Sequence, residues 1–248
     1  EKAARRTFLE GLGFGLVLLT IGIVWLLISR EAAIEDWKKL ARKYALTVAQ
    51  SVHQSMVSSD LILTNISDSV QESRLSTPEE VRQALANDET FAMLKARMPI
   101  APQVDVTTIV ALNGDVINFS RSFPPPPINL SDRDYFKALL SDDKLDVFLS
   151  VPVRNRGTGT WTFYLARKVR APDGRMLGVL LTGLHSSYFS DYFERVSLAG
   201  GSAVSLFRQD GVLMARFPDR EDLIGTSFAS QPAFKDVILK GLDESIVT

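Results

Sequence analysis

The sequence predicts an α+β protein with an N-terminal transmembrane helix, a long external helix and two tandem lobes built on antiparallel sheets, the second lobe incomplete. Three observations support this prediction. An uncharged apolar run lies near the N-terminus, a long stretch without proline or glycine follows it, and two similar segments recur further along the chain. The predicted divisions are a basic tip with the membrane anchor at 1–29, a stalk helix at 30–75, a first lobe at 76–199 and the start of a second lobe at 200–248.

Composition limits the classes of function. The chain has 248 residues, 46% of them hydrophobic, which is enough for one large core or two of ordinary size. The net charge of −1 provides no basic field to attract nucleic acid. The absence of cysteine excludes disulfides, thiolate zinc sites and cysteine nucleophiles. Charged and aromatic side chains remain as the candidates for binding.

The apolar run from Gly11 to Ile28 contains no charged residue and is long enough to cross a hydrocarbon core of about 30 Å as a helix. Basic residues precede it, so the positive-inside rule places the N-terminus in the cytoplasm and the chain after Arg30 outside. A cleaved signal peptide is the alternative, but its apolar region usually has about 7–15 residues and ends at a small-x-small site. Here the run is longer and ends in Ile28-Ser29-Arg30-Glu31, which favours an uncleaved anchor.

Residues 31–75 contain neither proline nor glycine and predict one long helix. Apolar and small residues recur along it at steps of three and four, which gives one apolar stripe. The stripe predicts a parallel homodimer through this helix, or alternatively packing of the helix on its own domain. The stripe includes Ile34, Trp37, Ala41, Tyr44, Val48, Ile62, Ile66 and Val70.

Helices and strands of the first lobe follow from local signals. Thr77 and Pro78 are typical of a helix start, and we expect this helix to run to about Met98. Residues 104–120 predict a hairpin that turns at Asn113-Gly114. Further along we expect an extended proline connector at 124–127, a short helix capped by Ser131-Asp132, strands at 146–154, 160–170 and 176–184, and a helix near 187–198.

The two similar segments predict a duplicated lobe. Thr107–Leu112 runs into Asn113-Gly114, and 97 positions later Val204–Phe207 runs into Asp210-Gly211. Two degenerate copies can also agree by chance. Arg133 and Tyr135 of the first copy fall opposite Gln231 and Ala233, so only the first copy keeps a cation and a phenol. This asymmetry suggests one binding lobe and one transmitting lobe.

The second copy is short, and Gly200-Gly201 is a natural hinge into it. Only two strands, one helix and the beginning of a third strand at Ile246-Val247 fit before Thr248. We therefore expect a longer natural protein, whose continuation completes the lobe, crosses back through the membrane and carries a cytoplasmic output domain.

The candidate ligand-binding residues lie in the first lobe. Arg133 has a planar fork that binds a carboxylate through two hydrogen bonds, or it pairs with the neighbouring Asp132 or Asp134. Tyr135 closes a pocket or serves as a core aromatic. In the strand at 160–170, one face carries Trp161, Phe163, Leu165 and Arg167 and the other carries Thr162 and Tyr164. If the first face lines the pocket, Trp161 and Phe163 form its wall and Arg167 is a second cation; otherwise Thr162 and Tyr164 replace them. Ser150 is a further candidate polar contact.

Catalysis has little support in this segment. The two histidines, His53 and His185, lack the spacing of a metal site, and no G-x-S-x-G elbow is present. His185 with Ser186, Ser187 and Asp191 is a weak candidate for a triad, because neighbours at a strand end and helix start rarely point together. We expect no catalytic residue, no metal and no cofactor here.

Three short motifs carry a resemblance to a family. They are Ser131-Asp132-Arg133-Asp134-Tyr135-Phe136, then Ser150-Val151-Pro152-Val153, then Gly159-Thr160-Trp161-Thr162. With the anchor and the long external helix, they make residues 30–248 resemble the double Cache (PAS-like) periplasmic sensor domains of bacterial diguanylate cyclases and sensor histidine kinases. The resemblance implies a receptor in the bacterial inner membrane, with the chain after about residue 30 in the periplasm.

The resemblance also implies where the ligand binds. In the family the membrane-distal lobe, here the first, binds a small molecule, and Arg133 and Tyr135 inherit the role of pocket residues. Amino-acid-sensing relatives pair this arginine with an aspartate near the end of the fifth strand. The corresponding segment here is Leu181-Thr182-Gly183-Leu184, which has no acid, so we expect a small carboxylate or other anion without an amine. The alternatives are a chemoreceptor ectodomain, or a membrane-anchored envelope scaffold or hydrolase.

Overall fold

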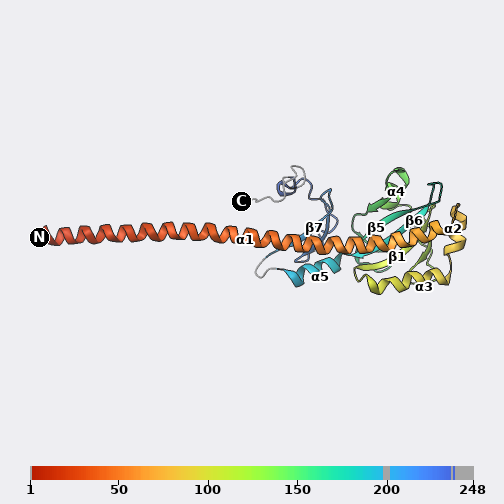
Figure 1. The fold of residues 1–248 in the computed structure, drawn as a ribbon, viewed down its shortest axis with the longest axis horizontal. Coiled ribbons are helices and arrows are strands. Elements are labelled where there is room, and N and C mark those ends of the chain that lie inside the picture. The colour runs from red at the N-terminus through yellow and green to blue at the C-terminus, as the bar shows by residue number, and fades with distance from the viewer. Residues whose placement is uncertain (1, 198–201, 236, 238–248) are drawn as a thin grey trace. The chain divides into compact units, whose positions relative to one another are not determined.

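The computed structural model describes residues 2–197, 202–235 and 237. Its first element, α1 (Lys2–Glu72), is one continuous helix of 71 residues that contains both the predicted anchor and the predicted stalk (Figure 1). Within this described part, the segment Gly13–Glu72 is the one that is long and apolar enough to cross a membrane, a test that a signal sequence near the N-terminus also passes.

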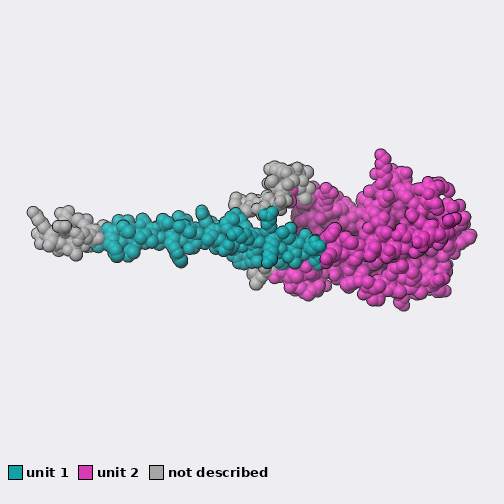
Figure 2. Space-filling model, viewed as in Figure 1, with its two compact units in different colours: residues 1–51 teal, residues 52–248 magenta. Residues whose placement is uncertain are grey.

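The chain forms two compact units, residues 1–51 and residues 52–248 (Figure 2). In the first unit the large apolar side chains of the predicted anchor are exposed, for example Phe14 at 67% and Trp25 at 70%. Such exposure in water is unfavourable at roughly 25 cal/mol per Å² of apolar surface, whereas contact with lipid removes that cost.

Two short helices follow α1 in the second unit. Thr77 forms a capping box with Glu80 at the start of α2 (Pro78–Leu85). The prediction of a single helix running to Met98 is wrong, because α2 ends at Leu85 and a separate helix, α3 (Asp88–Arg97), follows. The side chain of Asn87 accepts a hydrogen bond from the backbone N–H of Thr90 at 2.8 Å, so Asn87 caps α3 instead of continuing α2. A 3₁₀ turn, η1 (Met98–Ile100), leads into the sheet.

An antiparallel sheet forms the centre of the first lobe. Its strands are β1 (Val104–Ala111), β2 (Val116–Phe119), β3 (Val147–Leu149), β4 (Val153–Arg154), β5 (Trp161–Arg170) and β6 (Met176–His185). The spatial order is β2-β1-β6-β5-β3, and β4 also pairs with β5. The predicted strand at 146–154 is thus divided in two around Ser150–Pro152, where Pro152 has no N–H to donate to a neighbouring strand.

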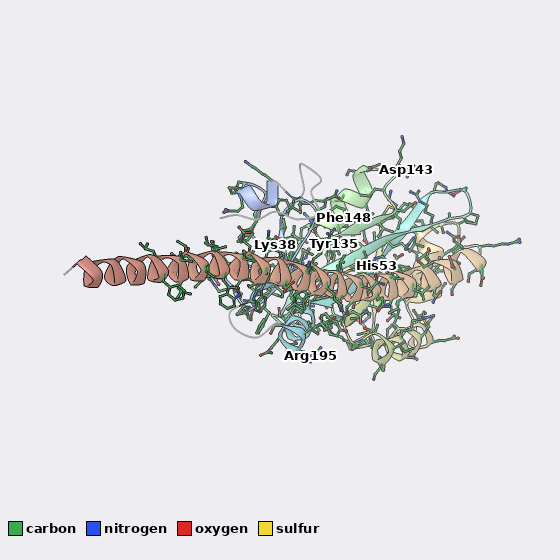
Figure 3. The ribbon with its side chains drawn as sticks, turned by 60° about the vertical axis from the view of Figure 1, so that its left-hand side comes forward. Lys38, His53, Tyr135, Asp143, Phe148 and Arg195 are labelled. Atoms are coloured by element: carbon green, nitrogen blue, oxygen red, sulfur yellow. The ribbon has the colours of Figure 1, made fainter. Side chains whose placement is uncertain are left out.

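Helices cover both faces of the sheet (Figure 1). On one face, α4 (Asp134–Ser141) buries Tyr135, Phe136 and Leu139 against Val106, Val110, Ala166, Val179 and Leu181. Figure 3 shows Tyr135 close to Phe148, which packs at the edge of the same cluster. On the other face, Phe163 of β5 packs on Phe189 of α5 (Ser186–Val196), with ring centroids 5.5 Å apart.

The second lobe contains β7 (Val204–Phe207), β8 (Leu213–Phe217) and α6 (Pro232–Phe234). Its turn repeats the hydrogen bonds of the first lobe. The N–H of Gly114 donates to Ala111 O at 2.9 Å, and the N–H of Gly211 donates to Arg208 O at 2.8 Å. Equivalent bonds also join each glycine carbonyl to the segment before the next helix, from the N–H groups of Leu130 and Phe228. This shared geometry supports the duplication.

The predicted α+β fold, in which a long apolar helix is followed along the chain by two lobes on antiparallel sheets, is confirmed. The predicted hinge at Gly200-Gly201 and the third strand at Ile246-Val247 lie outside the described residues.

Candidate ligand-binding site

A cavity of about 210 Å³ lies in the first lobe, which we call the first-lobe cavity. Its walls come from β1, β2, β5 and β6, from the proline connector and from the start of α4. Apolar side chains such as Val106, Phe119 and Leu181 form much of the surface. The polar side chains of the lining are those of Thr108, Arg121, Arg133, Tyr135, Asn155, Arg156 and Tyr164.

Arg133 is at the N-cap of α4 and lines this cavity. The sequence placed it within the helix, whereas the helix begins one residue later. Its Nε is buried without a hydrogen-bond partner, and no described residue forms an ion pair with its guanidinium. A buried N–H without an acceptor is unfavourable, so this nitrogen is free to donate to a ligand in the cavity.

The predicted alternative, an ion pair between Arg133 and a neighbouring acid, is not what the structure contains. Asp132 pairs with Arg156, whose Nη2 lies 2.6 Å from Asp132 Oδ2. Asp134 accepts hydrogen bonds from two backbone N–H groups, that of Tyr135 at 2.8 Å and that of Val151 at 2.9 Å. Both acids next to Arg133 are therefore engaged elsewhere.

Tyr135 is the second predicted residue that lines the cavity, although only 1% of its surface is exposed. Its ring lies against that of Tyr164, with centroids 5.4 Å apart. Its hydroxyl is buried and has no hydrogen-bond partner among the described residues. Burial raises the pKa of Tyr135, so the phenol stays neutral and can donate a hydrogen bond.

Two further arginines, which sequence reasoning missed, line the same cavity. Arg121, which follows β2, makes a short ion pair with Asp105, and its Nη1 lies 3.5 Å from Asn155 Oδ1. Arg156 is held by Asp132. No signal in the sequence joins these positions, because they come from connections after different strands. No carboxylate is among the described residues that line the cavity, but Arg121 and Arg156 are each paired with an acid beside it, which leaves Arg133 as the arginine of the lining without an ion pair among the described residues.

Asp105 lies behind this wall and orients part of it. Its carboxylate contacts Arg121, accepts a hydrogen bond from Asn155 at 3.2 Å, and lies 3.1 Å from Nε2 of His185. Burial acts to raise the pKa of Asp105, but the hydrogen bonds from His185 and Arg121 outweigh it and hold this pKa below its usual value. Asn155 also donates to the hydroxyl of Tyr164 at 3.2 Å, so the network reaches the cavity surface.

The β5 side chains reach the cavity from the face that the sequence offered as the alternative. Tyr164 lines the first-lobe cavity, whereas Thr162, on the same face, does not. Phe163 is fully buried against α5, which corrects its expected place in the pocket wall. Trp161 lines a different cavity, between the lobes.

Arg167 and Ser150 are also corrected. Arg167 does not line the first-lobe cavity and instead pairs with Asp60 of α1 at 2.6 Å. Ser150 is fully buried, and its hydroxyl accepts from the N–H of Tyr164 and donates to the carbonyl of Val151, each at 2.8 Å. Ser150 therefore supports the backbone at the break between β3 and β4.

The structure gives His185 a structural partner. Its Nε2 contacts Asp105, and its Nδ1 has no hydrogen-bond partner among the described residues, so it is not bonded to the serines or Asp191 of α5. Within the described parts of the chain, no group of three or more His, Cys, Asp or Glu side chains is placed to hold a metal ion.

Comparison with known proteins agrees with this architecture. Residues 186–246 match a family model described as dCache_1_like, a histidine kinase sensor domain. The extracellular domain of rpHK1S-Z16, a proposed histidine kinase, is 24% identical, with a TM-score of 0.68 over 80% of this chain and 77% of that one. An extracellular ligand-binding receptor from Desulfohalobium retbaense is 14% identical, with a TM-score of 0.61 over 81% of this chain. The match covers 34% of that receptor.

No curated protein sequence matches the chain significantly. The described residues of the two lobes have the fold of a Cache sensor domain, as the resemblance of the short motifs implied.

Proposed function

We propose that this chain is the extracytoplasmic sensing region of a bacterial transmembrane receptor, and that its first lobe binds a small carboxylate. The observation that carries the proposal is Arg133, whose Nε is buried without a partner beside a cavity that no described carboxylate lines. A carboxylate ligand would accept hydrogen bonds from this guanidinium and give the buried Nε–H the acceptor that it lacks. The neutral hydroxyl of Tyr135 is a second donor.

The lining also indicates whether the ligand carries an amino group. An α-amino acid carries an ammonium group, which needs a carboxylate or several oxygen acceptors when it is buried. The described lining offers hydroxyl and amide groups but three arginines and no acid. Arg121 and Arg156 are already paired with Asp105 and Asp132, so Arg133 provides the charge repulsion that favours carboxylates without an amine, or with more than one carboxylate, over amino acids.

Coupling to the membrane would run through β5. Tyr164 lies on the cavity side of this strand, and Arg167 on its other side holds Asp60 of α1. A ligand that prefers one position of β5 would bias the position of α1 by the same free energy. The proposal therefore makes this segment a binding and transmitting region, with any catalysis in an output domain of the diguanylate cyclase or histidine kinase type.

The test of the ligand class uses the full chain in detergent or nanodiscs. Thermal shift and isothermal titration with a panel of mono- and dicarboxylates should identify a ligand. Arg133→Ala should lower the affinity for that ligand about tenfold or more. Arg175→Ala is the matched control, because this exposed arginine pairs with Asp173 outside the cavity. A binder that keeps its affinity in Arg133→Ala, or a panel in which only α-amino acids bind, would refute the assigned ligand class.

We further propose that α1 inserts in the bacterial inner membrane, that the lobes lie in the periplasm, and that two copies associate through α1. The described residues Val57 and Leu61 of α1 are apolar and 51% and 56% exposed. Because the chain has no cysteine, Val57→Cys and Leu61→Cys each create a single thiol. Oxidation should cross-link these variants into dimers in membranes, whereas Asp173→Cys in an exposed turn should remain monomeric. Equal cross-linking of all three would contradict the α1 interface.

A further inference from the structure

We propose a second ligand site, in the cavity between the two lobes, for a linear organic cation that carries two ammonium groups. This cavity has a volume of about 370 Å³ and is separate from the first-lobe cavity. The proposed anion site does not use it, so the inference stands independently of the proposed function.

The charge of the inter-lobe cavity is the opposite of that of the first-lobe cavity. Four carboxylates line it, Asp191 and Glu194 from α5 and Asp219 and Glu221 from the loop after β8. Arg154 is the one cation among its described lining residues, and it pairs with Glu221 at 2.7 Å. No described residue forms an ion pair with the other three acids. The lining therefore has a net formal charge of −3, from four acids and one arginine.

Unpartnered polar atoms independently indicate a missing ligand. Ser186 lines the cavity and is 3% exposed, yet its hydroxyl has no hydrogen-bond partner among the described residues. The Nε1 of Trp161, which also lines the cavity, is buried without a partner. Buried polar groups in folded proteins almost always have a partner. An ammonium group can donate to the Ser186 hydroxyl, whereas the N–H of Trp161 needs an acceptor, which a water carried with the ligand supplies.

The placement of the acids favours a diamine over a compact cation. One pair of carboxylates comes from α5 in the first lobe and the other from the second lobe, so two ammonium groups can each meet one pair. The methylenes between them would lie on the apolar part of the lining, formed by Trp161, Phe217 and Ile224. Arg154 already covers the ring of Trp161, 4.5 Å from its centroid, which leaves the edge of the indole for the ligand.

A metal ion is a poorer occupant. The described acids of the cavity do not form a group of three or more that could hold a metal ion. The positive end of the α5 dipole acts within the first turn, at Ser186 and Ser187, whereas Asp191 and Glu194 lie further along the helix. The acidic end of the cavity thus keeps its attraction for an ammonium group.

The consequence of binding is mechanical coupling. A diamine held between α5 and the loop after β8 would join the two lobes in the way that the Arg154–Glu221 pair now does. It would also stabilise the folded chain, since it binds the folded lobes and not the unfolded chain.

The test is isothermal titration of the full chain in detergent with putrescine, with butane-1,4-diol as the uncharged analogue of the same length. Putrescine should bind with a Kd below about 1 mM and should raise the melting temperature of the protein. Its affinity should fall with added salt. Absence of putrescine binding up to about 10 mM, or equal binding of the diol, would overturn the proposal.

Variants locate the site. The double variant Asp191→Asn/Glu194→Gln should lower the affinity for putrescine about tenfold or more. The double variant Asp68→Asn/Glu72→Gln on α1 makes the same change of charge and should alter this affinity less than about twofold. Equal weakening by both double variants would show a non-specific charge effect and overturn the site. If the α5 double variant fails to fold, Asp219→Asn in the exposed loop gives the same test. Arg133→Ala should leave putrescine binding unchanged, so failure of the carboxylate site and failure of this site are distinguishable.

Discussion

The Nη2 atom of Arg167 on β5 lies 2.6 Å from Oδ1 and 2.8 Å from Oδ2 of Asp60 on α1, so one nitrogen contacts both carboxylate oxygens. Three residues earlier on the same strand, Tyr164 lines the first-lobe cavity from the other face of the sheet. A single strand thus carries a cavity wall on one side and a contact to α1 on the other. This relationship explains why Arg167 is unavailable as a second ligand-binding cation.

A double-mutant cycle should measure this contact. The Arg167 side chain is 22% exposed and that of Asp60 is 40% exposed, so solvent screens part of the attraction. We expect a coupling free energy of about 0.5–1 kcal/mol between Arg167→Gln and Asp60→Asn in unfolding of the full chain. The same cycle with Arg175→Gln and Asp60→Asn is the control and should be additive. Additivity in the first cycle would mean that the contact contributes nothing to stability.

The register of β5 shows where sequence reasoning ends. The alternation of side chains correctly predicts that Trp161, Phe163 and Arg167 share a face opposite Tyr164. It does not decide which face meets the ligand, because helices cover both sides of the central strands and most of β5 is buried. That choice depends on tertiary contacts with α1, α4 and α5.

Arg133 and Tyr135 were predictable because their residue types and their place before and within a short helix match a recognisable motif. The network of Asp105, Arg121 and Asn155 was not, since these residues lie up to 50 positions apart and meet only when β1, β2 and the β4–β5 hairpin assemble. The break at Asn87 was missed for a local reason. Its side chain competes for the backbone N–H of Thr90, and this cap outweighs continuation of the preceding helix.

Removal of the Tyr135 hydroxyl should have opposite effects on stability and binding. Because this buried oxygen has no described partner, Tyr135→Phe should leave the free energy of unfolding unchanged or raise it by about 1 kcal/mol. Carboxylate affinity should fall about three- to tenfold, since a donor is lost. Chemical unfolding and isothermal titration measure the two quantities.

The matched control for that variant is Tyr164→Phe. The Tyr164 hydroxyl accepts a hydrogen bond from Asn155, so its removal should lower the free energy of unfolding by about 1 kcal/mol. A Tyr135→Phe variant as destabilised as Tyr164→Phe would show that the Tyr135 hydroxyl has a partner in solution.

Asp105 should contribute to the loss of stability at acid pH. Burial alone would raise the pKa of its carboxyl, yet the bonds from His185 and Arg121 lower this pKa below the ordinary value of 3.8. Since the folded state has the lower pKa, the stabilisation is complete above the unfolded pKa and is lost as pH falls through the folded pKa, below about pH 4. Asp105→Asn should be less stable at pH 7 by about 1–3 kcal/mol and should lose less stability on acidification. Urea unfolding at pH 7, 4 and 3 provides the measurement, and parallel pH profiles of the two proteins would contradict the assignment.

Gly114 connects the repeated turn to the ligand site. Its φ of +88° is unfavourable for other residues, and a Cβ there would lie 2.7 Å from both the N and Cβ atoms of Ser131. Gly174 has a similar φ of +86° but open space around the position of a Cβ. We therefore expect Gly174→Ala to lower the free energy of unfolding by about 1 kcal/mol from backbone strain alone. Gly114→Ala should lower it by about 2 kcal/mol or more, because the backbone of Ser131 must also move.

Gly114→Ala should also weaken the binding of the carboxylate, since Ser131 lies two residues before Arg133. Gly174→Ala should bind the carboxylate with the affinity of the unchanged chain. Equal losses of stability in the two variants would show that strain alone acts at Gly114, and unchanged affinity in Gly114→Ala would show that the turn does not position Arg133.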